Sequence, residues 1–327
     1  AGIGLVTAHK ALQRAETEGW AQREDGARRL RVTPHAPRLA RSCFAPEPPT
    51  LTYWVLLSER RLQAEFRLPG LSEGLHEALA FSSSRYLFLD AAAKTHDIEA
   101  IVAEQVRGAD AAYLLLSLPA RWKRVFERLG VPCVVIGDVE PSIHLPNVYV
   151  DQRRAGLVAG GLLCRSGRVV TLCGEQLVGG ESKLLAGVCD ATRLLEQPEP
   201  DADAFYTLLP SDAAALTERI DRLLAAPDRP HGILATRTEF AMATLAVAAR
   251  RGLRIPRDLQ LVGLGHHPLF EFCYPRVSSI GVPSDQELGR RCAELLSRVL
   301  LTGTKEASTI EIDLSVIERE STLPRKR

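Results

Sequence analysis

Short apolar runs alternate with amphipathic stretches throughout residues 50–327, and this alternation is the strongest constraint on the fold. The runs lie at 51–57, 86–89, 112–118, 133–136, 168–173, 232–236 and 259–264. Each is rich in branched or aromatic residues, as strands buried on both faces of a parallel sheet are. Regular alternation of such strands with helices predicts an α/β fold of doubly wound parallel sheets.

Helical patterns fill the intervals between the apolar runs. One pattern runs through Ile98 and Val102, and another places Leu216 and Ile220 on one face, with Ser211 as the predicted N-cap. One open sheet rarely holds this many strands. We therefore expect two lobes rather than one.

Composition separates the chain into three regions. Residues 1–33 hold one helical pattern and a charged hairpin. Residues 34–49 contain five prolines, which cannot continue regular structure and indicate a linker. Residues 50–327 carry the strand and helix alternation.

The charge of the whole chain is almost balanced, with 41 basic and 40 acidic side chains. No global field attracts nucleic acid, so any DNA contact must come from a local patch. No apolar run approaches the roughly 18 residues of a membrane span, and no export signal is visible. These features favour a cytoplasmic location without a membrane partner.

The cysteines are odd in number and form no CxxC pair; they are Cys43, Cys133, Cys164, Cys173, Cys189, Cys273 and Cys292. This pattern argues against a disulfide framework or a zinc site and fits a reducing compartment. Most of these cysteines stand in apolar contexts, where we expect them to fill the core.

The first 33 residues combine an amphipathic helix with a hairpin. The helical stripe includes Ala8 and Leu12, and the hairpin joins 21–24 to 28–32 around Asp25-Gly26, a strong turn signal. Residues 1–49 carry eight basic and five acidic side chains. Helix and hairpin can be a solvated pair without a nucleic-acid role, or what is left of a winged helix-turn-helix.

The order and spacing of this segment resemble a winged helix-turn-helix head of the gluconate-repressor (GntR) type. Residues 2–12 match its turn and recognition helix, and residues 18–32 match its wing. The resemblance implies DNA contacts from Thr7, His9, Lys10, Arg14, Gly26, Arg28 and Arg29. Two positions depart from the family pattern, because Gly4-Leu5 replaces a small hydroxyl residue followed by arginine and Arg28 replaces the second glycine of the wing.

The helices that normally precede the recognition helix are missing, and the chain starts with Ala1. We therefore expect a fragment. A recognition helix without its supporting helices cannot hold its docking angle, so this chain alone is expected to bind DNA poorly.

The C-terminal third resembles the effector-binding domain of the lac-repressor family. The resemblance rests on the motifs at 231–236 (HGILAT), 249–258 (ARRGLRIPRD), 259–265 (LQLVGLG), 274–280 (YPRVSSI) and 316–322 (VIEREST). It implies a two-lobed periplasmic-binding-protein-like fold that dimerises and binds a small effector between its lobes. Lobe one would span about 50–150 and lobe two about 151–276, with a return through 277–300 and a last strand at 309–317 in lobe two.

Ligands of this fold lie at the carboxyl ends of strands. The effector-binding residues expected there are Ser58, Asp90, Ser117, Asp138, Lys183, Arg237 and His266. Trp122, Phe205 and Tyr206 are the aromatic candidates for stacking on a sugar ring. Each assignment also has a plain alternative, such as a helix-start residue for Arg237 and a loop histidine for His266.

Three positions depart from the pocket pattern of the family. Leu184 stands where an arginine is common, Arg237-Thr238 replaces an Asn-Asp pair, and Gly265 replaces an aspartate. A neutral sugar, an anionic sugar derivative held by guanidinium, and a pocket that has lost its ligand all stay open.

Enzymatic motifs are missing from the sequence. It contains no Walker loop, no HExxH and no GxSxG, and the histidine pair 266–267 lacks spaced metal partners. We assign no catalytic residue, metal or cofactor. The predicted function is a transcriptional regulator that binds operator DNA as a homodimer and responds to a carbohydrate or carbohydrate derivative; the alternative is a solute-binding protein without a DNA-binding role.

Overall fold

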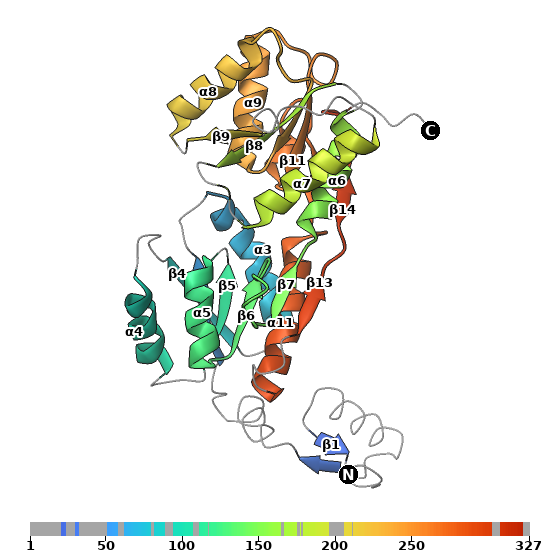
Figure 1. The fold of residues 1–327 in the computed structure, drawn as a ribbon. Helices are drawn as coiled ribbons and strands as arrows, with labels where there is room; N and C mark the ends of the chain where they lie inside the picture. Colours follow the sequence, from blue (N-terminus) through green and yellow to red (C-terminus); the bar gives the residue numbers. More distant parts are fainter. Residues whose placement is uncertain are drawn as a thin grey trace. The chain divides into compact units, whose positions relative to one another are not determined.

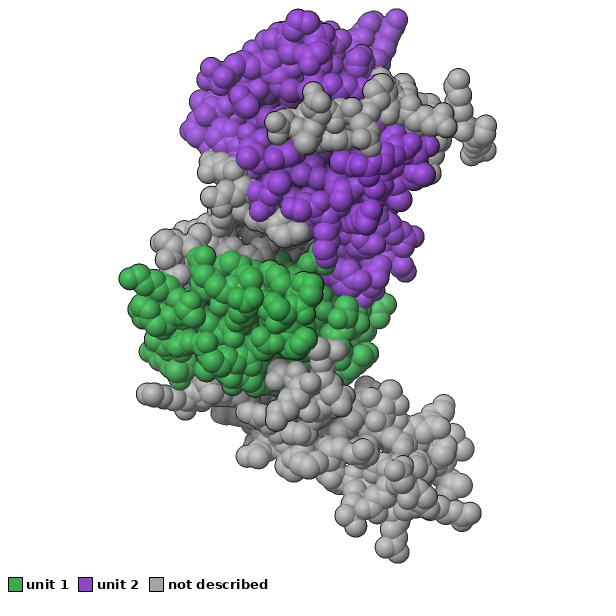
Figure 2. Space-filling view, viewed as in Figure 1, with its two compact units in different colours: residues 1–60, 69–148, 288–310 green, residues 61–68, 149–287, 311–327 purple. Residues whose placement is uncertain are grey.

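The computed structural model describes the parts of the chain whose placement is defined. These are residues 21–23, 30–32, 51–57, 62–79, 82–88, 94–106, 111–116, 118–164, 167–174, 177, 179–195, 206–210, 212–302 and 308–322. They belong to two compact units (Figure 2). Unit 1 comprises residues 1–60, 69–148 and 288–310, and unit 2 comprises residues 61–68, 149–287 and 311–327.

Unit 1 is built on a sheet with the strand order β13-β7-β6-β5-β3-β4. Its strands are β3 (Leu51–Leu57), β4 (Ser82–Phe88), β5 (Ala111–Leu116), β6 (Cys133–Ile136), β7 (Asn147–Tyr149) and β13 (Thr309–Glu311). The pairs from β4 through β7 are all parallel. Parallel neighbours need crossover connections. Helices supply these between the strands from β3 to β6, and residues 137–146, which contain no helix, join β6 to β7.

Helices lie beside this sheet (Figure 1). They are α3 (Leu62–Ala78), α4 (Thr95–Val106), α5 (Ala120–Leu129) and α11 (Asp285–Thr302). A core cluster joins α4 and α5 to the sheet. On α5, Trp122 and Phe126 are fully buried, and the Phe126 ring meets the Tyr113 ring of β5 edge to face at 5.3 Å. The helix ends at Gly130, whose φ of 63° is easy only for glycine.

Unit 2 is built on a second sheet with the strand order β14-β12-β11-β10-β8-β9. Its strands are β8 (Val169–Gly174), β9 (Tyr206–Leu209), β10 (Gly232–Ala235), β11 (Gln260–Leu264), β12 (Ser278–Gly281) and β14 (Ser315–Ile317). β14 runs antiparallel to β12, and the other pairs are parallel. The expected strand 309–317 is therefore wrong in detail, because 309–311 and 315–317 join different sheets.

Helices cover both faces of the unit 2 sheet (Figure 1). They are α6 (Gln152–Leu163), α7 (Gly179–Leu194), α8 (Ala213–Ala225), α9 (Thr238–Arg250) and α10 (Leu269–Phe272). One core cluster joins α8, α9 and α10 to the sheet, and another joins α6 and α7 to it. The N-cap of α8 is Asp212, whose carboxylate accepts a hydrogen bond of 2.8 Å from the Ala215 amide. The prediction of Ser211 as the N-cap was therefore wrong.

β1 (Ala21–Arg23) and β2 (Leu30–Val32) form an antiparallel ribbon, with Ala21 opposite Val32 and Arg23 opposite Leu30. This confirms the strands of the predicted hairpin. The residues expected to contact DNA lie outside the described residues; they are Thr7, His9, Lys10, Arg14, Gly26, Arg28 and Arg29.

Four described cysteines, Cys133, Cys164, Cys173 and Cys292, are buried, as expected of core-filling thiols. The helices found in the described ranges include none that combines the length and the apolar character needed to cross a bilayer. The same ranges contain no cluster of three or more His, Cys, Asp or Glu side chains arranged for a metal ion.

Glycines allow α6 and α7 to pack backbone against backbone. A Cβ on Gly156 would collide with the Leu184 carbonyl of α7, and one on Gly187 would collide with the Arg153 carbonyl of α6. A side chain at either position would separate the two helices, because a helix backbone cannot move aside as a side chain can. Gly161, on the same helix as Gly156, faces open space.

We expect Gly156→Ala to destabilise the protein by about 1–3 kcal/mol, because the added methyl group overpacks the helix contact. Gly161→Ala on the same helix should instead stabilise it by about 0.5–1 kcal/mol, because alanine loses less backbone entropy on folding. Urea unfolding of both variants measures the difference. Equal stabilities for the two variants would show that the close helix contact is not required.

Candidate ligand-binding site

Both sheets contain a point where the chain connections leave neighbouring strands in opposite directions. In unit 2 the chain passes from β8 to its outer neighbour β9, and from β10 to β11 on the other side. In unit 1 the strands β3 and β5 are related in the same way. Ligands of open α/β sheets bind beside the carboxyl ends of strands at such switch points.

The switch point of unit 1 is only partly described. Ser58 follows β3, Asp90 follows β4 and Ser117 follows β5, and all three lie outside the described residues. Their effector-binding roles stay predictions.

Asp138 follows β6, and its backbone carbonyl accepts a hydrogen bond of 2.8 Å from the Lys123 ammonium. The same ammonium lies 3.1 Å from a Glu140 carboxylate oxygen, although Lys123 is almost fully buried. Asn147 donates to the Gly137 carbonyl at 3.1 Å. These bonds fix the backbone that carries the Asp138 side chain at the end of β6, and its role as a ligand stays a prediction.

Arg237 comes two residues after β10 and is only 7% exposed. Its guanidinium carbon lies 5.3 Å from the centre of the Phe240 ring, within the range of a cation–π contact. A Cβ on Gly174, the last residue of β8, would collide with the guanidinium. Glycine at the end of β8 therefore makes room for Arg237, which is a buried residue and not a surface one.

Glu181 was not recognised in the sequence and stands at the same switch point. It lies in the first turn of α7 and is 7% exposed. The Thr236 hydroxyl lies 3.1 Å from its carboxylate and 2.9 Å from the Leu172 carbonyl. The one available signal was its position in the first turn of the helix after β8, which begins near the carboxyl end of that strand.

The charges of Glu181 and Arg237 both affect the pKa of the Cys173 thiol. The pKa of this thiol is raised to about 12, first by burial and then by the Glu181 carboxylate, while the Arg237 guanidinium acts in the opposite direction. The two charged groups are thus near one sulfur atom at the end of β8. The structure does not bring Lys183 into this group, since Lys183 is exposed two positions after the buried Glu181 on α7, and its role stays a prediction.

His266 follows β11 after Gly265, whose φ of 81° lies in the left-handed region. The Nδ1 atom of His266 lies 2.8 Å from the Ser279 hydroxyl. Burial lowers the pKa of His266, and the nearby Arg319 lowers it further. The Arg319 guanidinium also donates to the Ser279 hydroxyl at 2.9 Å, so the histidine is joined to the C-terminal segment.

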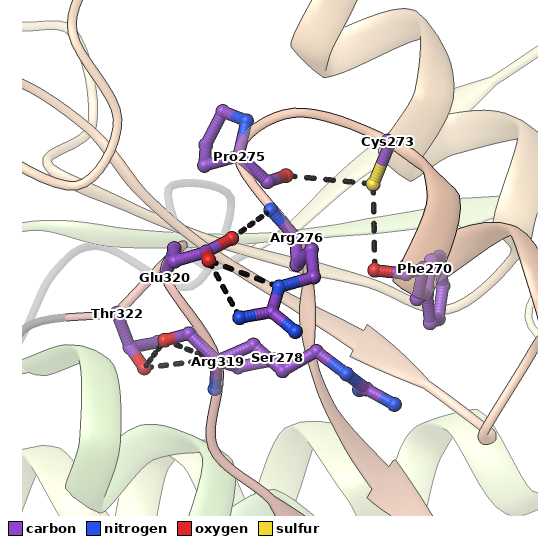
Figure 3. A network of polar contacts seen from close by, with 8 residues as sticks. All are labelled: Phe270, Cys273, Pro275, Arg276, Ser278, Arg319, Glu320 and Thr322. Atoms are coloured by element: carbon purple, nitrogen blue, oxygen red, sulfur yellow. Dashed lines mark hydrogen bonds and ion pairs between the residues drawn. The ribbon is translucent and has the colours of Figure 1, made fainter.

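The segment 319–322 is bonded to β12 by a polar network (Figure 3). The Ser278 hydroxyl accepts a hydrogen bond of 2.8 Å from the Arg319 backbone amide, and it lies 2.8 Å from the Thr322 hydroxyl. Arg276 donates two side-chain hydrogen bonds to Glu320, at 2.7 and 2.9 Å. The Arg319 guanidinium crosses to α10 and donates to Glu271 at 2.9 Å. This network fixes β12, whose Ser279 hydroxyl lies 2.8 Å from His266.

The aromatic residues expected to stack on a sugar have a different placement. Trp122 is fully buried in the core of unit 1, so its assignment to a binding surface was wrong. The amphipathic helix α5 turns it toward the sheet. Phe205 lies outside the described residues, and Tyr206 is a half-buried residue of β9 that packs against a core cluster.

Comparisons with known proteins agree with this architecture. Residues 172–322 match the family model of the periplasmic binding protein-like domain. The transcriptional regulator CelR, solved in a complex with cellobiose, superposes with a TM-score of 0.71 at 21% identity, covering 98% of this chain and 91% of that one. A ribose-bound LacI-family regulator from Enterococcus faecium superposes with a TM-score of 0.69 at 19% identity. The superposition covers 84% of this chain and 100% of that one.

The described region has the periplasmic-binding-protein-like fold. Curated relatives with similar sequences are transcriptional regulators. The HTH-type regulator GntR of Pseudomonas aeruginosa is 30% identical over 204 residues, and the repressor CytR of Escherichia coli is 27% identical over 206 residues. The match covers 61% of this chain and 58% of each relative, so the chain spans about three fifths of their length.

We expect Arg319→Gln to lower the free energy of unfolding by about 2–3 kcal/mol, because buried bonds to a charged group are lost. The matched change Arg276→Gln should cost far less, since that ion pair is exposed to water. Chemical unfolding compares the two. Equal losses would contradict a special role of Arg319 in holding the C-terminal segment to β12.

Proposed function

We propose that the chain is the effector-sensing part of a DNA-binding transcriptional regulator of the LacI type. The observation that carries this proposal is the switch point of unit 2, where Arg237, Glu181 and Thr236 gather at the carboxyl ends of β8 and β10. A small carbohydrate or carbohydrate derivative fits polar groups of this kind at that edge. The relatives named as regulators, and the sugars in the cellobiose and ribose complexes, support this choice.

We assign DNA recognition to residues 1–33, as a winged head of the GntR type. The β1–β2 ribbon supports this assignment, since a wing is an antiparallel ribbon. Arg28 and Arg29 would meet phosphates from the ribbon, and Lys10 and Arg14 from the preceding helix. Ligand binding would change the populations of two conformations, and that shift would alter operator affinity.

The DNA-binding role predicts a specific experimental outcome. The protein expressed from its complete reading frame should enrich particular genomic fragments, with an affinity that falls steeply as salt rises. Replacing Arg28 and Arg29 together by glutamine should weaken binding to all fragments and reduce the salt slope by about 2. Replacing the exposed residues Lys94 and Arg257 together by glutamine removes the same number of charges and serves as the control.

Genomic selection at two salt concentrations measures these effects. A folded protein that enriches no fragment at either concentration would overturn the regulator proposal and favour a solute-binding role.

We further propose that the protein works as a homodimer and that α10 lies at the interface. Phe272 is 83% exposed and Tyr274 is 93% exposed, and Leu269 on the same short segment is also exposed. Large exposed apolar groups that gather on one segment mark interaction surfaces. A second copy is the occupant that two-fold operator binding requires.

We expect replacing Phe272 and Tyr274 together by serine to weaken self-association about tenfold or more, because aromatic anchors carry much of the energy of an interface. Leu194→Ser is the control, since Leu194 is 74% exposed on α7, which packs in a different core cluster from α10. Sedimentation equilibrium measures the association constants. An unchanged dimer in the double variant would remove α10 from the interface.

A further inference from the structure

The Ser279 hydroxyl joins a histidine and an arginine in the interior of unit 2. Ser279 lies on β12 and is fully buried. Its hydroxyl lies 2.8 Å from Nδ1 of His266 and accepts a hydrogen bond of 2.9 Å from the Arg319 guanidinium. These two groups are its hydrogen-bond partners among the residues that the structure describes. The chemistry of the partners therefore decides the direction of each bond.

The arginine determines where the Ser279 proton goes. A guanidinium can only donate hydrogen bonds, so the hydroxyl accepts from Arg319. The hydroxyl also has one proton of its own, and a buried donor without an acceptor is costly. Of the two partners, only Nδ1 of His266 can accept this proton. A neutral imidazole whose Nδ1 accepts a hydrogen bond carries its single proton on Nε2, which is the Nε2–H tautomer.

Arg319 is held in place by further bonds. Its side chain is only 8% exposed. The guanidinium also donates to the Val277 carbonyl at 2.9 Å and to the Glu271 carboxylate at 2.9 Å. Because arginine keeps its charge at any pH that a folded protein meets, a charged imidazole would bond the same oxygen as a permanent cation. The repulsion between them disfavours the charged form of His266.

The surroundings of His266 also favour the neutral ring. Burial lowers its pKa most and Arg319 lowers it further, whereas Asp285 and the Ser315 backbone act in the opposite direction. Nε2 is buried, and the Ser315 backbone does not complete a hydrogen bond to it. Charging the ring would put a proton on Nδ1 and so remove the acceptor of the Ser279 hydroxyl.

We propose that Ser279 and Arg319 are positioning residues of the candidate effector site: they hold His266 neutral with its proton on Nε2, and so place a hydrogen-bond donor without a charge at the carboxyl end of β11. This inference rests on the proposed function, since it takes the effector to bind at this edge of unit 2. A buried N–H group needs an acceptor, and the oxygen of a carbohydrate hydroxyl is one. A neutral imidazole offers this bond without the positive charge that would favour an anion.

Nitrogen NMR spectroscopy of the full chain with isotope-labelled histidine tests this arrangement, because protonated and bare ring nitrogens resonate far apart. Loss of the signals in His266→Gln assigns them. At neutral pH the wild-type protein should show a bare Nδ1 and a protonated Nε2 at His266. In Ser279→Ala the ratio of this tautomer to the other should fall about five- to tenfold, since one hydrogen bond contributes about that factor.

Two further variants separate this role from a general effect on the strand. Ser278→Ala is the matched control, since Ser278 is also buried on β12 but bonds the Arg319 backbone and Thr322. It should leave the tautomer of His266 unchanged. Ser279→Thr keeps a hydroxyl and should restore the wild-type spectrum. Circular dichroism with thermal melting verifies that each variant is folded.

The pH dependence of stability gives a second measurement. The folded-state pKa of His266 lies below its ordinary value of 6.5, so the unfolded chain binds this proton more readily. The stability that comes from the neutral ring is complete above about pH 6.5 and is lost as the pH falls through the folded-state pKa. His266→Gln keeps an acceptor oxygen for Ser279 but has no such proton. Its free energy of unfolding should therefore fall less than that of the wild type between about pH 7 and pH 5.

A wild-type spectrum with a proton on Nδ1 of His266, or with a charged ring at neutral pH, would overturn the proposal. A folded Ser279→Ala variant with an unchanged tautomer ratio would do so as well, as would an equal change in Ser278→Ala. Equal pH dependence of the wild type and His266→Gln would contradict the neutral ring. These measurements use neither an effector nor DNA, so they can succeed or fail independently of the proposed function.

Discussion

The burial of both sheet faces is the constraint on which the rest of the structure depends. In unit 2, Val170 and Leu172 of β8 belong to the core cluster of α8 and α9, while Val169 of the same strand belongs to that of α6 and α7. Both faces of such a strand are closed to water and to ligands. Polar side chains that can bind a ligand therefore lie at the strand ends. The chain leaves β8 and β10 in opposite directions, so the carboxyl ends of these two strands are the expected binding position.

Close backbone contacts keep those ends in place. Gly156 and Gly187 let α6 and α7 touch, and α7 delivers Glu181 to the carboxyl edge of β8. On the other side of the sheet, Arg319 connects Ser279 to Glu271 of α10. The rigid parts of the fold thus determine where the few charged groups stand, and the charged groups in turn need those parts to compensate their burial.

Most of the core strands could be predicted from the sequence, because their apolar character is a local property. The expected runs 51–57 and 133–136 coincide with β3 and β6. β12 was missed because its Ser278 and Ser279 look exposed in the sequence but are buried, with partners on Arg319 and Thr322 about 40 residues further along the chain. The strands β7 and β13 have three residues each, too few for a recognisable pattern.

The candidate site was predictable only in part, for a related reason. Arg237 could be found because it directly follows an apolar run, which is a local signal. In the sequence, the positive charge of Arg237 by itself favoured the interpretation that the ligand is an anion. The structure adds Glu181, which lies 56 positions earlier in the printed sequence, at the neighbouring strand end, where the Thr236 hydroxyl is 3.1 Å from its carboxylate.

The meaning of a charge at a strand end therefore depends on the strand beside it. Most parallel neighbours of these sheets are separated in the sequence by at least one helix, and β8 and β10 are separated by two helices and a strand. No local pattern can show which charged side chains stand at the neighbouring strand end. An arginine and a glutamate at neighbouring ends offer a ligand both hydrogen-bond donors and acceptors, where an arginine alone would offer only donors. The chemistry of such an edge is thus set by residues that are far apart in the sequence.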